Sequence, residues 1–275
     1  MTTSTDEQRE ISERILLSAH DLTVYRDAHR VLDHVGITVR RGGFTALIGA
    51  NGSGKTTLLQ ALLGAIHISN GSVTRPSRAK GVGGIGYVPQ HVDFDPDIPL
   101  TVWDTVALGL DGGRLGFPRR NQRFNDAVLR ALQAVDIDAL AQRPIGGLSG
   151  GQQQRALIAH ALVASPEVLL MDEPLSSLDP PGAQRVVDVV DKARRAYGTA
   201  VLMSSHDVTP LLPYADTVAY LRAGHLTEGP TDDIITTDVL TRLYQQPVEV
   251  GVVNGRRVLL PVSEATSAEQ ARRVR

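Results

Sequence analysis

The stretch GANGSGKT at residues 49–56 restricts the possible folds of this chain more than any other feature. It satisfies the pattern G-x-x-x-x-G-K-[ST] in full, and it lies between the apolar run FTALIG and the amphipathic run TTLLQALLGA. In such a context the N–H groups of a glycine-rich turn and of a helix N-terminus surround phosphate groups. The motif therefore predicts a strand, a phosphate-binding loop and a helix in direct succession.

The rest of the chain alternates short apolar runs with amphipathic segments, which is typical of a layered α/β fold with a mainly parallel sheet. EVLLMD at residues 167–172 and TAVLMSS at 199–205 are, with FTALIG at 44–49, the clearest buried strands. Each of them ends at a polar or glycine-rich loop. Because ligands bind at the carboxyl ends of strands in such folds, we expect the site at these ends.

The segments outside this core have their own signals. The spacing of Val128, Leu129, Leu132 and Val135 predicts a helix within a more helical segment at about 99–148, which we interpret as a subdomain. Near the end, VEVGVV and RRVLLPV flank an Asn-Gly pair and favour a β-hairpin. We therefore divide the chain into a solvated tail (1–14), a main domain that includes the helical subdomain (15–230), a helix and hairpin extension (231–262) and a disordered tail (263–275).

The composition excludes several classes of function. A net charge of −2 over 275 residues gives no general attraction to nucleic acid, so we expect no nucleic-acid partner. The absence of cysteine excludes disulfides and thiolate metal sites. No run approaches the roughly 18 consecutive apolar residues needed to cross a bilayer, so we expect any membrane role to depend on a partner.

A second acidic element supports the phosphate loop. The apolar run VLLM carries Asp172 and Glu173 to the tip of a buried strand, and Pro174 ends that strand immediately afterwards. Asp172 can hold a magnesium ion, and Glu173 can orient or deprotonate an attacking water. In the loop itself, Lys55 reaches the β- and γ-phosphate oxygens and the Thr56 hydroxyl binds magnesium. These residues together predict hydrolysis of a nucleoside triphosphate.

With LSGGQQQR at residues 148–155, the chain closely resembles the nucleotide-binding subunits of ATP-binding cassette (ABC) transporters from about residue 22 to 229. The resemblance implies ATP and Mg²⁺ as cofactors, a P-loop NTPase-type core, an antiparallel β subdomain and a helical subdomain that carries the LSGGQ signature. It also implies that Gln90 is the glutamine-loop residue, Asp179 ends the D-loop SSLD, His206 is the switch histidine and Tyr25 stacks on adenine.

The site assignment contains three groups. The catalytic residues are Lys55, Gln90, Glu173 and His206. The magnesium ligands are Thr56, Gln90 and Asp172. The residues assigned to ATP are Tyr25, Gly49, Asn51, Gly52, Ser53, Gly54, Lys55, Thr56, Thr57, Ser149, Gly150, Gly151, Gln152 and Asp179.

The signature at residues 148–152 predicts a second copy of the chain. Helical periodicity begins directly after its glycines, with Leu157, Ile158, Ala161 and Leu162 on one face, so the glycines lie at a helix N-terminus that favours an anion. The phosphates bound by the same chain are already surrounded by residues 49–56. We therefore expect an ATP-dependent head-to-tail dimer in which Ser149 and Gly151 contact the partner's γ-phosphate.

The resemblance implies a transport ATPase at the cytoplasmic face of the membrane, bound to permease subunits and served by an extracytoplasmic substrate-binding protein. QHVDFDPDIPLTVWDTVALG at 90–109 is similar to cassettes for zinc, manganese or iron uptake. The alternatives are another cargo or a soluble ABC ATPase that acts on DNA or ribosomes. Val102, Trp103 and Val106 could line a groove for a permease helix, or Trp103 could belong to the core.

Overall fold

The computed structural model describes residues 15–76, 84–90, 92, 94–95, 98–111, 121–253 and 256–261. The expected tails at 1–14 and 263–275 lie outside these residues, as do His91, Asp93 and Asp97 of the segment that follows Gln90.

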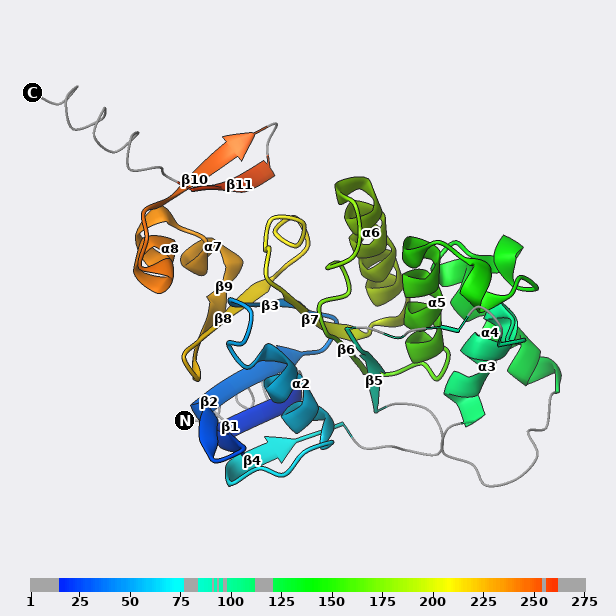
Figure 1. The fold of residues 1–275 in the computed structure, drawn as a ribbon, viewed down its shortest axis with the longest axis horizontal. Coiled ribbons are helices and arrows are strands. Elements are labelled where there is room, and N and C mark those ends of the chain that lie inside the picture. Colours follow the sequence, from blue (N-terminus) through cyan, green and yellow to red (C-terminus); the bar gives the residue numbers. More distant parts are fainter. Residues whose placement is uncertain are drawn as a thin grey trace, which may run out of the picture.

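A six-stranded sheet forms the centre of the molecule, in the order β5-β6-β7-β3-β8-β9 (Figure 1). All neighbours are parallel except β8 and β9, which pair antiparallel. The three strands expected from apolar runs are confirmed as β3, β6 and β7, and all their residues are buried. The strands are β3 (Phe44–Ile48), β5 (Ile85–Val88), β6 (Val168–Met171), β7 (Ala200–Ser205), β8 (Thr217–Arg222) and β9 (His225–Pro230).

The two faces of this sheet bury different side chains because alternate residues of a strand point to opposite sides. In β3, Leu47 joins a core with the helix α2 (Lys55–Leu63), whereas Ala46 and Ile48 join a core with the helix α6 (Pro180–Tyr197). Both faces of β3 are therefore covered, which explains why its sequence is uninterrupted apolar rather than alternating.

A three-stranded antiparallel sheet covers α2 on its other side. Its strands are β1 (Ile15–Arg26), β2 (His29–Arg40) and β4 (Asn70–Thr74), in the order β2-β1-β4. Two hydrogen bonds join it to the central sheet: the Asp33 N–H donates to the Gly224 carbonyl at 2.9 Å, and the Thr38 N–H donates to the Glu228 carboxylate at 3.1 Å. This is the antiparallel β subdomain that the resemblance implies.

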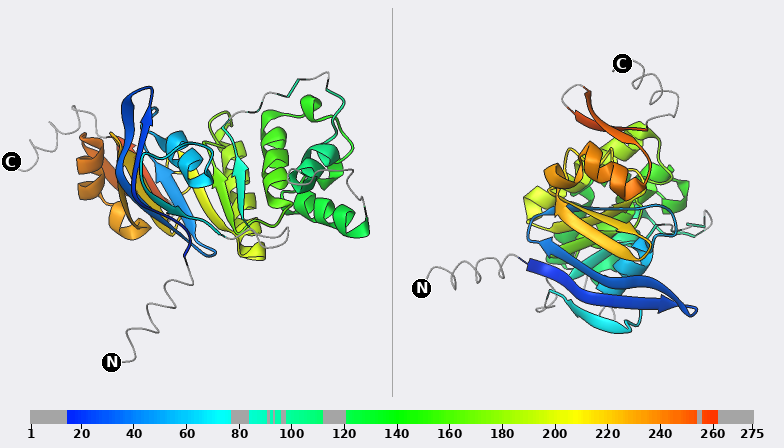
Figure 2. Two further views of the ribbon diagram at one scale, coloured as in Figure 1. Left: turned by 90° about the horizontal axis from the view of Figure 1, so that it is seen from below. Right: turned by 90° about the vertical axis from the view of Figure 1, so that its left-hand side faces the viewer.

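The helices α3 (Val102–Asp111), α4 (Gln122–Ala134) and α5 (Gly150–Leu162) form a lobe at one end of the molecule, which we call the helical lobe (Figure 2). Two short 3-10 turns, η1 (Asp138–Leu140) and η2 (Ile145–Gly147), join α4 to α5. The predicted helix is confirmed as α4, in which Val128 and Leu132 are buried. Leu129 differs from its neighbours, because its side chain is 41% exposed on the outer side of the helix.

The expectation that Val102 and Val106 line a docking groove is wrong. Both side chains have no exposed surface and belong to the core beneath α3. They are four residues apart, so the helical period places them on the same inward face. Trp103 packs partly buried against the same core, in agreement with the alternative interpretation.

The C-terminal extension follows β9. It contains the short helices α7 (Thr231–Ile234) and α8 (Thr237–Tyr244) and the antiparallel strands β10 (Val248–Val253) and β11 (Arg256–Pro261), so the predicted hairpin pairing is confirmed. Its Asn-Gly turn lies outside the described residues. The extension is tied to β8 because the Leu243 carbonyl accepts hydrogen bonds from Tyr220 at 3.0 Å and Arg222 at 2.6 Å.

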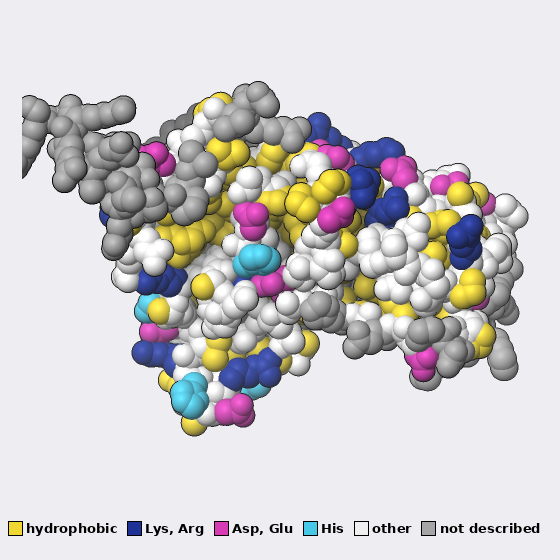
Figure 3. All heavy atoms as spheres, turned by 45° about the horizontal axis from the view of Figure 1, so that its top comes forward, with side chains coloured by type: hydrophobic (Ala, Val, Ile, Leu, Met, Phe, Trp, Pro, Cys, Tyr) yellow, Lys and Arg dark blue, Asp and Glu magenta, His cyan; other side chains and the backbone are white. Residues whose placement is uncertain are grey.

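The surface of the molecule carries both signs of charge. On the face in Figure 3, acidic and basic side chains are interspersed and apolar side chains gather between them. Within the described part of the chain, no helix combines the length and the apolar character that a membrane span requires.

The contact between α3 and α5 generates a prediction at Gly109. A Cβ added there would lie 2.2 Å from the His160 carbonyl oxygen and 2.7 Å from Val163 Cγ1. Helix propensity favours alanine over glycine by about 1 kcal/mol. Overpacking costs about 1 to 3 kcal/mol, and a clash with a backbone oxygen lies in the upper part of that range, at about 2 to 3 kcal/mol. After the gain in helix propensity is subtracted, Gly109→Ala should lower the free energy of unfolding by about 1 to 2 kcal/mol.

Urea denaturation measures this change. Gly147→Ala is the matched control, because a Cβ at Gly147 would meet nothing within 4 Å. If Gly109→Ala were as stable as the wild type or more stable, the close α3 to α5 contact would be contradicted.

Candidate nucleotide site

The order of the strands brings the separate motifs to one edge of the sheet. In the parallel ladders, Ile48 of β3 pairs with Ser205 of β7, and Met171 of β6 pairs with Met203 of β7. The phosphate loop (residues 49–56), the Asp172-Glu173 pair and His206 follow directly after these strands. All of them therefore leave the sheet at the same edge.

The phosphate loop depends on its glycines. Gly52 and Gly54 have φ values of +76° and +105°, which side chains rarely adopt. A Cβ on Gly49 would lie 2.4 Å from the Leu221 carbonyl oxygen and 2.7 Å from Ser53 Oγ. The loop then enters α2 at Lys55, so the N–H groups of the first helical turn point into the loop. The backbone alone thus makes a concave surface suited to an anion.

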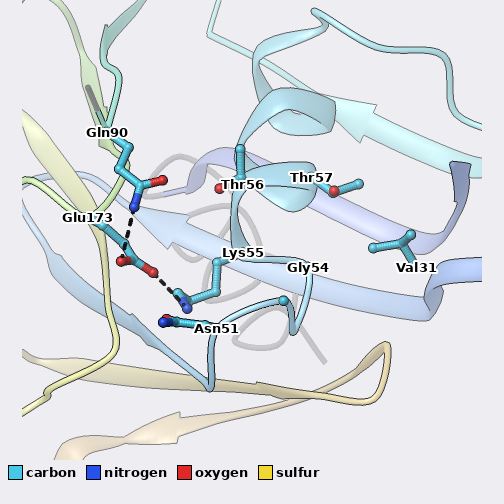
Figure 4. A pocket seen from close by; sticks show the side chains of 9 residues that line it. Val31, Asn51, Gly54, Lys55, Thr56, Thr57, Gln90 and Glu173 are labelled. Atoms are coloured by element: carbon cyan, nitrogen blue, oxygen red, sulfur yellow. Dashed lines mark hydrogen bonds and ion pairs between the residues drawn. The ribbon is translucent and has the colours of Figure 1, made fainter. Parts of the chain in front are cut away.

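Lys55 is held inside the loop. Its Nζ donates to the carbonyls of Gly49 at 2.8 Å and Ala50 at 3.1 Å. The same nitrogen lies 2.9 Å from Glu173 Oε1, and the side chains are only 4% and 10% exposed. This buried ion pair connects the loop after β3 to the tip of β6 (Figure 4).

Glu173 is the centre of the predicted catalytic group. The Gln90 side-chain amide donates to Glu173 Oε2 at 3.4 Å, and His206 Nδ1 lies 3.7 Å from the same oxygen. Lys55 contacts the other oxygen, so all four residues predicted as catalytic gather at one carboxylate. The His206 side chain is 54% exposed, so it is the member of this group that faces solvent. The Glu173 backbone is left-handed, with a φ of +43°.

Asp172 lies beneath this group and is 1% exposed. Its Oδ1 accepts a hydrogen bond from Ser204 Oγ at 2.9 Å, and Tyr87 also hydrogen-bonds to the carboxylate. Burial, and then the neighbouring negative charge and hydrogen bond of Asp172, raise the pKa of Tyr87 to about 12. The phenol of Tyr87 therefore keeps its proton at neutral pH and remains a donor to Asp172.

A cavity of about 540 Å³ opens above these residues. It brings together eight of the residues assigned to the nucleotide, magnesium or catalysis, together with Val31 of β2, which the sequence analysis missed. The lining residues are Val31, Asn51, Gly52, Gly54, Lys55, Thr56, Thr57, Gln90 and Glu173.

Other predicted residues lie elsewhere. Tyr25 is 50% exposed near the end of β1 and does not line this cavity. The Asp179 carboxylate caps α6 by accepting a hydrogen bond from the Gly182 N–H at 3.0 Å. Ser149 precedes α5 in the helical lobe, where its N–H donates to the Gln152 side chain at 3.0 Å (Figures 1 and 2). Gly150 and Gly151 begin α5, a helix that Figure 1 shows apart from α2.

The donors of the site fit magnesium bound together with phosphate. The Thr56 hydroxyl and the Gln90 amide line the cavity, and the Asp172 carboxylate lies below it. Hydroxyl, amide and carboxylate oxygens combined with phosphate oxygens are the ligands that Mg²⁺ takes. Within the described part of the chain, the buried Ser53 Oγ has no hydrogen-bond partner, so the loop retains capacity for a polar ligand.

The sequence analysis missed Ser204, Tyr87 and Val31 as members of the site. Ser204 and Tyr87 each lie on a strand next to β6, and their hydroxyls reach Asp172 only because of that strand order. The available signal was weak: each is a polar side chain near the carboxyl end of a predicted strand.

Known proteins with similar sequences are named as ATP-binding proteins, in agreement with this geometry. The ABC transporter family matches residues 32–176. The zinc import ATP-binding protein ZnuC of Cereibacter sphaeroides is 37% identical over 214 residues, covering 78% of this chain and 82% of that protein. The protein of the same name in Paracoccus denitrificans is 38% identical over 231 residues, covering 83% and 85%.

Solved structures show the same arrangement of elements. An ABC transporter in an inward-facing conformation superposes with a TM-score of 0.80 at 25% identity, covering 91% of this chain and 99% of that chain. The cbiO1 protein of Clostridium perfringens, part of the ABC transporter complex cbiONQ, has a TM-score of 0.70 at 27% identity, covering 83% and 94%.

Proposed function

The chain belongs to the ABC transporter family, and on this premise we propose that it is the ATP-hydrolysing subunit of an importer for a divalent metal ion, zinc or manganese. The observation that carries the ATPase role is the gathering of Lys55, Gln90 and His206 around the Glu173 carboxylate, beside a phosphate loop. The cargo is supported by the relatives named as zinc import proteins.

In this proposal each residue in or near the cavity has its own role in binding or hydrolysing ATP. Lys55 exchanges the carbonyls of Gly49 and Ala50 for β- and γ-phosphate oxygens, to which its ammonium bonds more strongly. Glu173 orients the attacking water or accepts its proton. His206, whose Nδ1 lies 3.7 Å from Glu173 Oε2, would contact the γ-phosphate. Thr56, Gln90 and Asp172 would hold Mg²⁺, which neutralises phosphate charge when bound. Tyr25 offers its exposed ring to adenine.

The second half of the site comes from a second copy of the chain. Ser149 and Gly150 are exposed at the N-terminus of α5, in a lobe separate from the phosphate loop. A helix N-terminus favours an anion, and a head-to-tail dimer would supply the partner's γ-phosphate. Hydrolysis then removes that contact, so ATP turnover opens the dimer.

The dimer would act on a membrane permease. We place the chain at the cytoplasmic face of the membrane, bound to permease subunits that receive cargo from an extracytoplasmic substrate-binding protein. The partly exposed side of the helical lobe, where Leu108 is 51% exposed, is the surface on offer for the permease.

The first prediction concerns the chemical step. Glu173→Gln keeps the phosphate ligands but removes the proton acceptor and the negative charge paired with Lys55. Turnover should fall by about 10²-fold or more while ATP affinity is retained, because Lys55 remains available to the phosphates. Steady-state ATPase assays and nucleotide binding measure the two effects. Lys55→Ala is the contrasting variant, because it should weaken nucleotide binding itself. Turnover within a few-fold of the wild type would contradict the role of Glu173.

The second prediction concerns the composite site. Ser149→Arg places bulk and charge at the proposed contact between copies and leaves the phosphate loop intact, so the chain should bind ATP but fail to dimerise. Light scattering with and without ATP measures the assembly. Ser72→Arg is the control, because Ser72 is an exposed serine of β4 in the antiparallel sheet. ATP-induced dimers of Ser149→Arg would show that the signature does not act across the interface.

The third prediction concerns the cargo. In proteoliposomes that contain the chain, its permease and its binding protein, ATPase activity should rise when the binding protein carries zinc or manganese. The metal-free binding protein is the control. Stimulation by a sugar, peptide or amino acid without a response to metal would exclude metal import and leave the ATPase role intact.

A further inference from the structure

We propose that Ser204 is a positioning residue for both acidic groups of the site, because its one hydroxyl holds the Asp172 carboxylate and the Glu173 backbone together. The inference rests on the roles proposed above for Asp172 and Glu173 in hydrolysis. It adds a fully buried residue that acts only through these two neighbours.

The hydrogen bonds of Ser204 have a defined direction. Ser204 is fully buried in β7, and its Oγ lies 2.9 Å from Asp172 Oδ1 and 2.8 Å from the Glu173 nitrogen. An ionised carboxylate only accepts and a backbone N–H only donates. The hydroxyl therefore donates its proton to Asp172 and accepts from Glu173, and both bonds can exist at once.

The sheet register explains why the hydroxyl falls at this position. The β6 to β7 ladder pairs Met171 with Met203, so Asp172 and Ser204 are the next residues on the two strands. The chain turns away from the sheet at Glu173, so the N–H of Glu173 has no carbonyl acceptor on a neighbouring strand. Ser204 Oγ accepts the hydrogen bond of this N–H in place of a strand carbonyl, so the buried donor does not lose its partner.

The hydroxyl also stabilises an unfavourable backbone conformation. Glu173 is a non-glycine residue at a φ of +43°, in the left-handed region that side chains disfavour. In this conformation its carboxylate reaches Lys55, Gln90 and His206. Removing the acceptor of the Glu173 N–H releases the turn, so the carboxylate would leave the arrangement that catalysis needs.

The two acidic residues depend on Ser204 to different degrees. Asp172 is also held by its own backbone, because its N–H donates to the Val88 carbonyl of β5 at 2.9 Å, so it keeps this support when the serine hydroxyl is removed. Ser204 Oγ is the acceptor that the structure gives to the Glu173 N–H. Loss of the hydroxyl should therefore affect turnover more than magnesium binding.

The test compares two full-length variants that each remove one buried hydroxyl, Ser204 near the end of β7 and Thr199 directly before its first residue. Ser204→Ala should lower the kcat for ATP by about 10-fold or more, which is the usual effect of a lost outer hydrogen bond, and raise the half-saturating magnesium concentration only about 2- to 5-fold. Thr199→Val is the control, because Thr199 is 1% exposed and its hydroxyl donates to the Pro166 carbonyl at 2.9 Å, away from the acidic pair. It should keep kcat and the magnesium requirement within twofold of the wild type.

A double variant separates positioning from general destabilisation. In the Glu173→Gln background the carboxylate that Ser204 positions is already gone. Adding Ser204→Ala should therefore lower turnover by less than a further twofold, because both changes remove the same contribution to catalysis. Urea denaturation confirms that each variant is folded at the assay temperature. Should Ser204→Ala not fold, Ser204→Cys, which has a weak donor and acceptor of similar shape, takes its place with the same expected losses.

The outcomes identify which idea fails. If Glu173→Gln lowers turnover but Ser204→Ala behaves like Thr199→Val, the positioning role is overturned and the proposed function stands. Equal and additive losses from Ser204→Ala in the wild-type and Glu173→Gln backgrounds would overturn it too. If Glu173→Gln leaves turnover unchanged, the proposed function itself fails.

Discussion

The geometry of the site depends on the buried ion pair between Lys55 and Glu173. It joins the loop after β3 to the tip of β6, two segments that are more than a hundred residues apart in the chain. Burying two charges is costly unless further hydrogen bonds satisfy them. The Gly49 and Ala50 carbonyls do this for the ammonium, and the Gln90 amide does so for the carboxylate. The ion pair therefore keeps the Lys55 ammonium and the Glu173 carboxylate together at the place where the phosphates of ATP would bind.

The order of the central sheet makes this pair possible. β3 and β6 both lie beside β7, so the phosphate loop, Asp172 and His206 emerge from three adjacent parallel strands at the same edge. The same adjacency places the Ser204 hydroxyl between Asp172 and Glu173. Because both faces of the sheet are covered by apolar side chains, the strand ends are rigid supports for polar residues.

The helical lobe has a different relation to the site. Its signature helix α5 packs against α3 and begins at Gly150, and it lies apart from α2, the helix that follows the phosphate loop of the same chain (Figure 1). The signature residues and the phosphate loop are on separate lobes, which fits a protein in which nucleotide controls the association of two copies. The contact between the signature of one copy and the γ-phosphate of the other exists only until that phosphate is hydrolysed. The helix α3, which is the next element along the chain after β5, belongs to the same lobe and carries the surface proposed for the permease.

Local patterns in the sequence determined the phosphate loop, the three buried strands and the helix α4, because each depends on residues close together in the chain. They also identified Lys55 and Glu173, and the family resemblance added Gln90 and His206. The convergence of these residues at one carboxylate follows once the strands are parallel neighbours. Only the tertiary structure decided that Val102 and Val106 are core, that Asp179 caps α6 and that Tyr87 and Ser204 hold Asp172. These contacts join segments that are far apart in the chain and depend on strand order and helix packing. Local periodicity predicts a helix or a strand, but it does not predict which distant segment that element will contact.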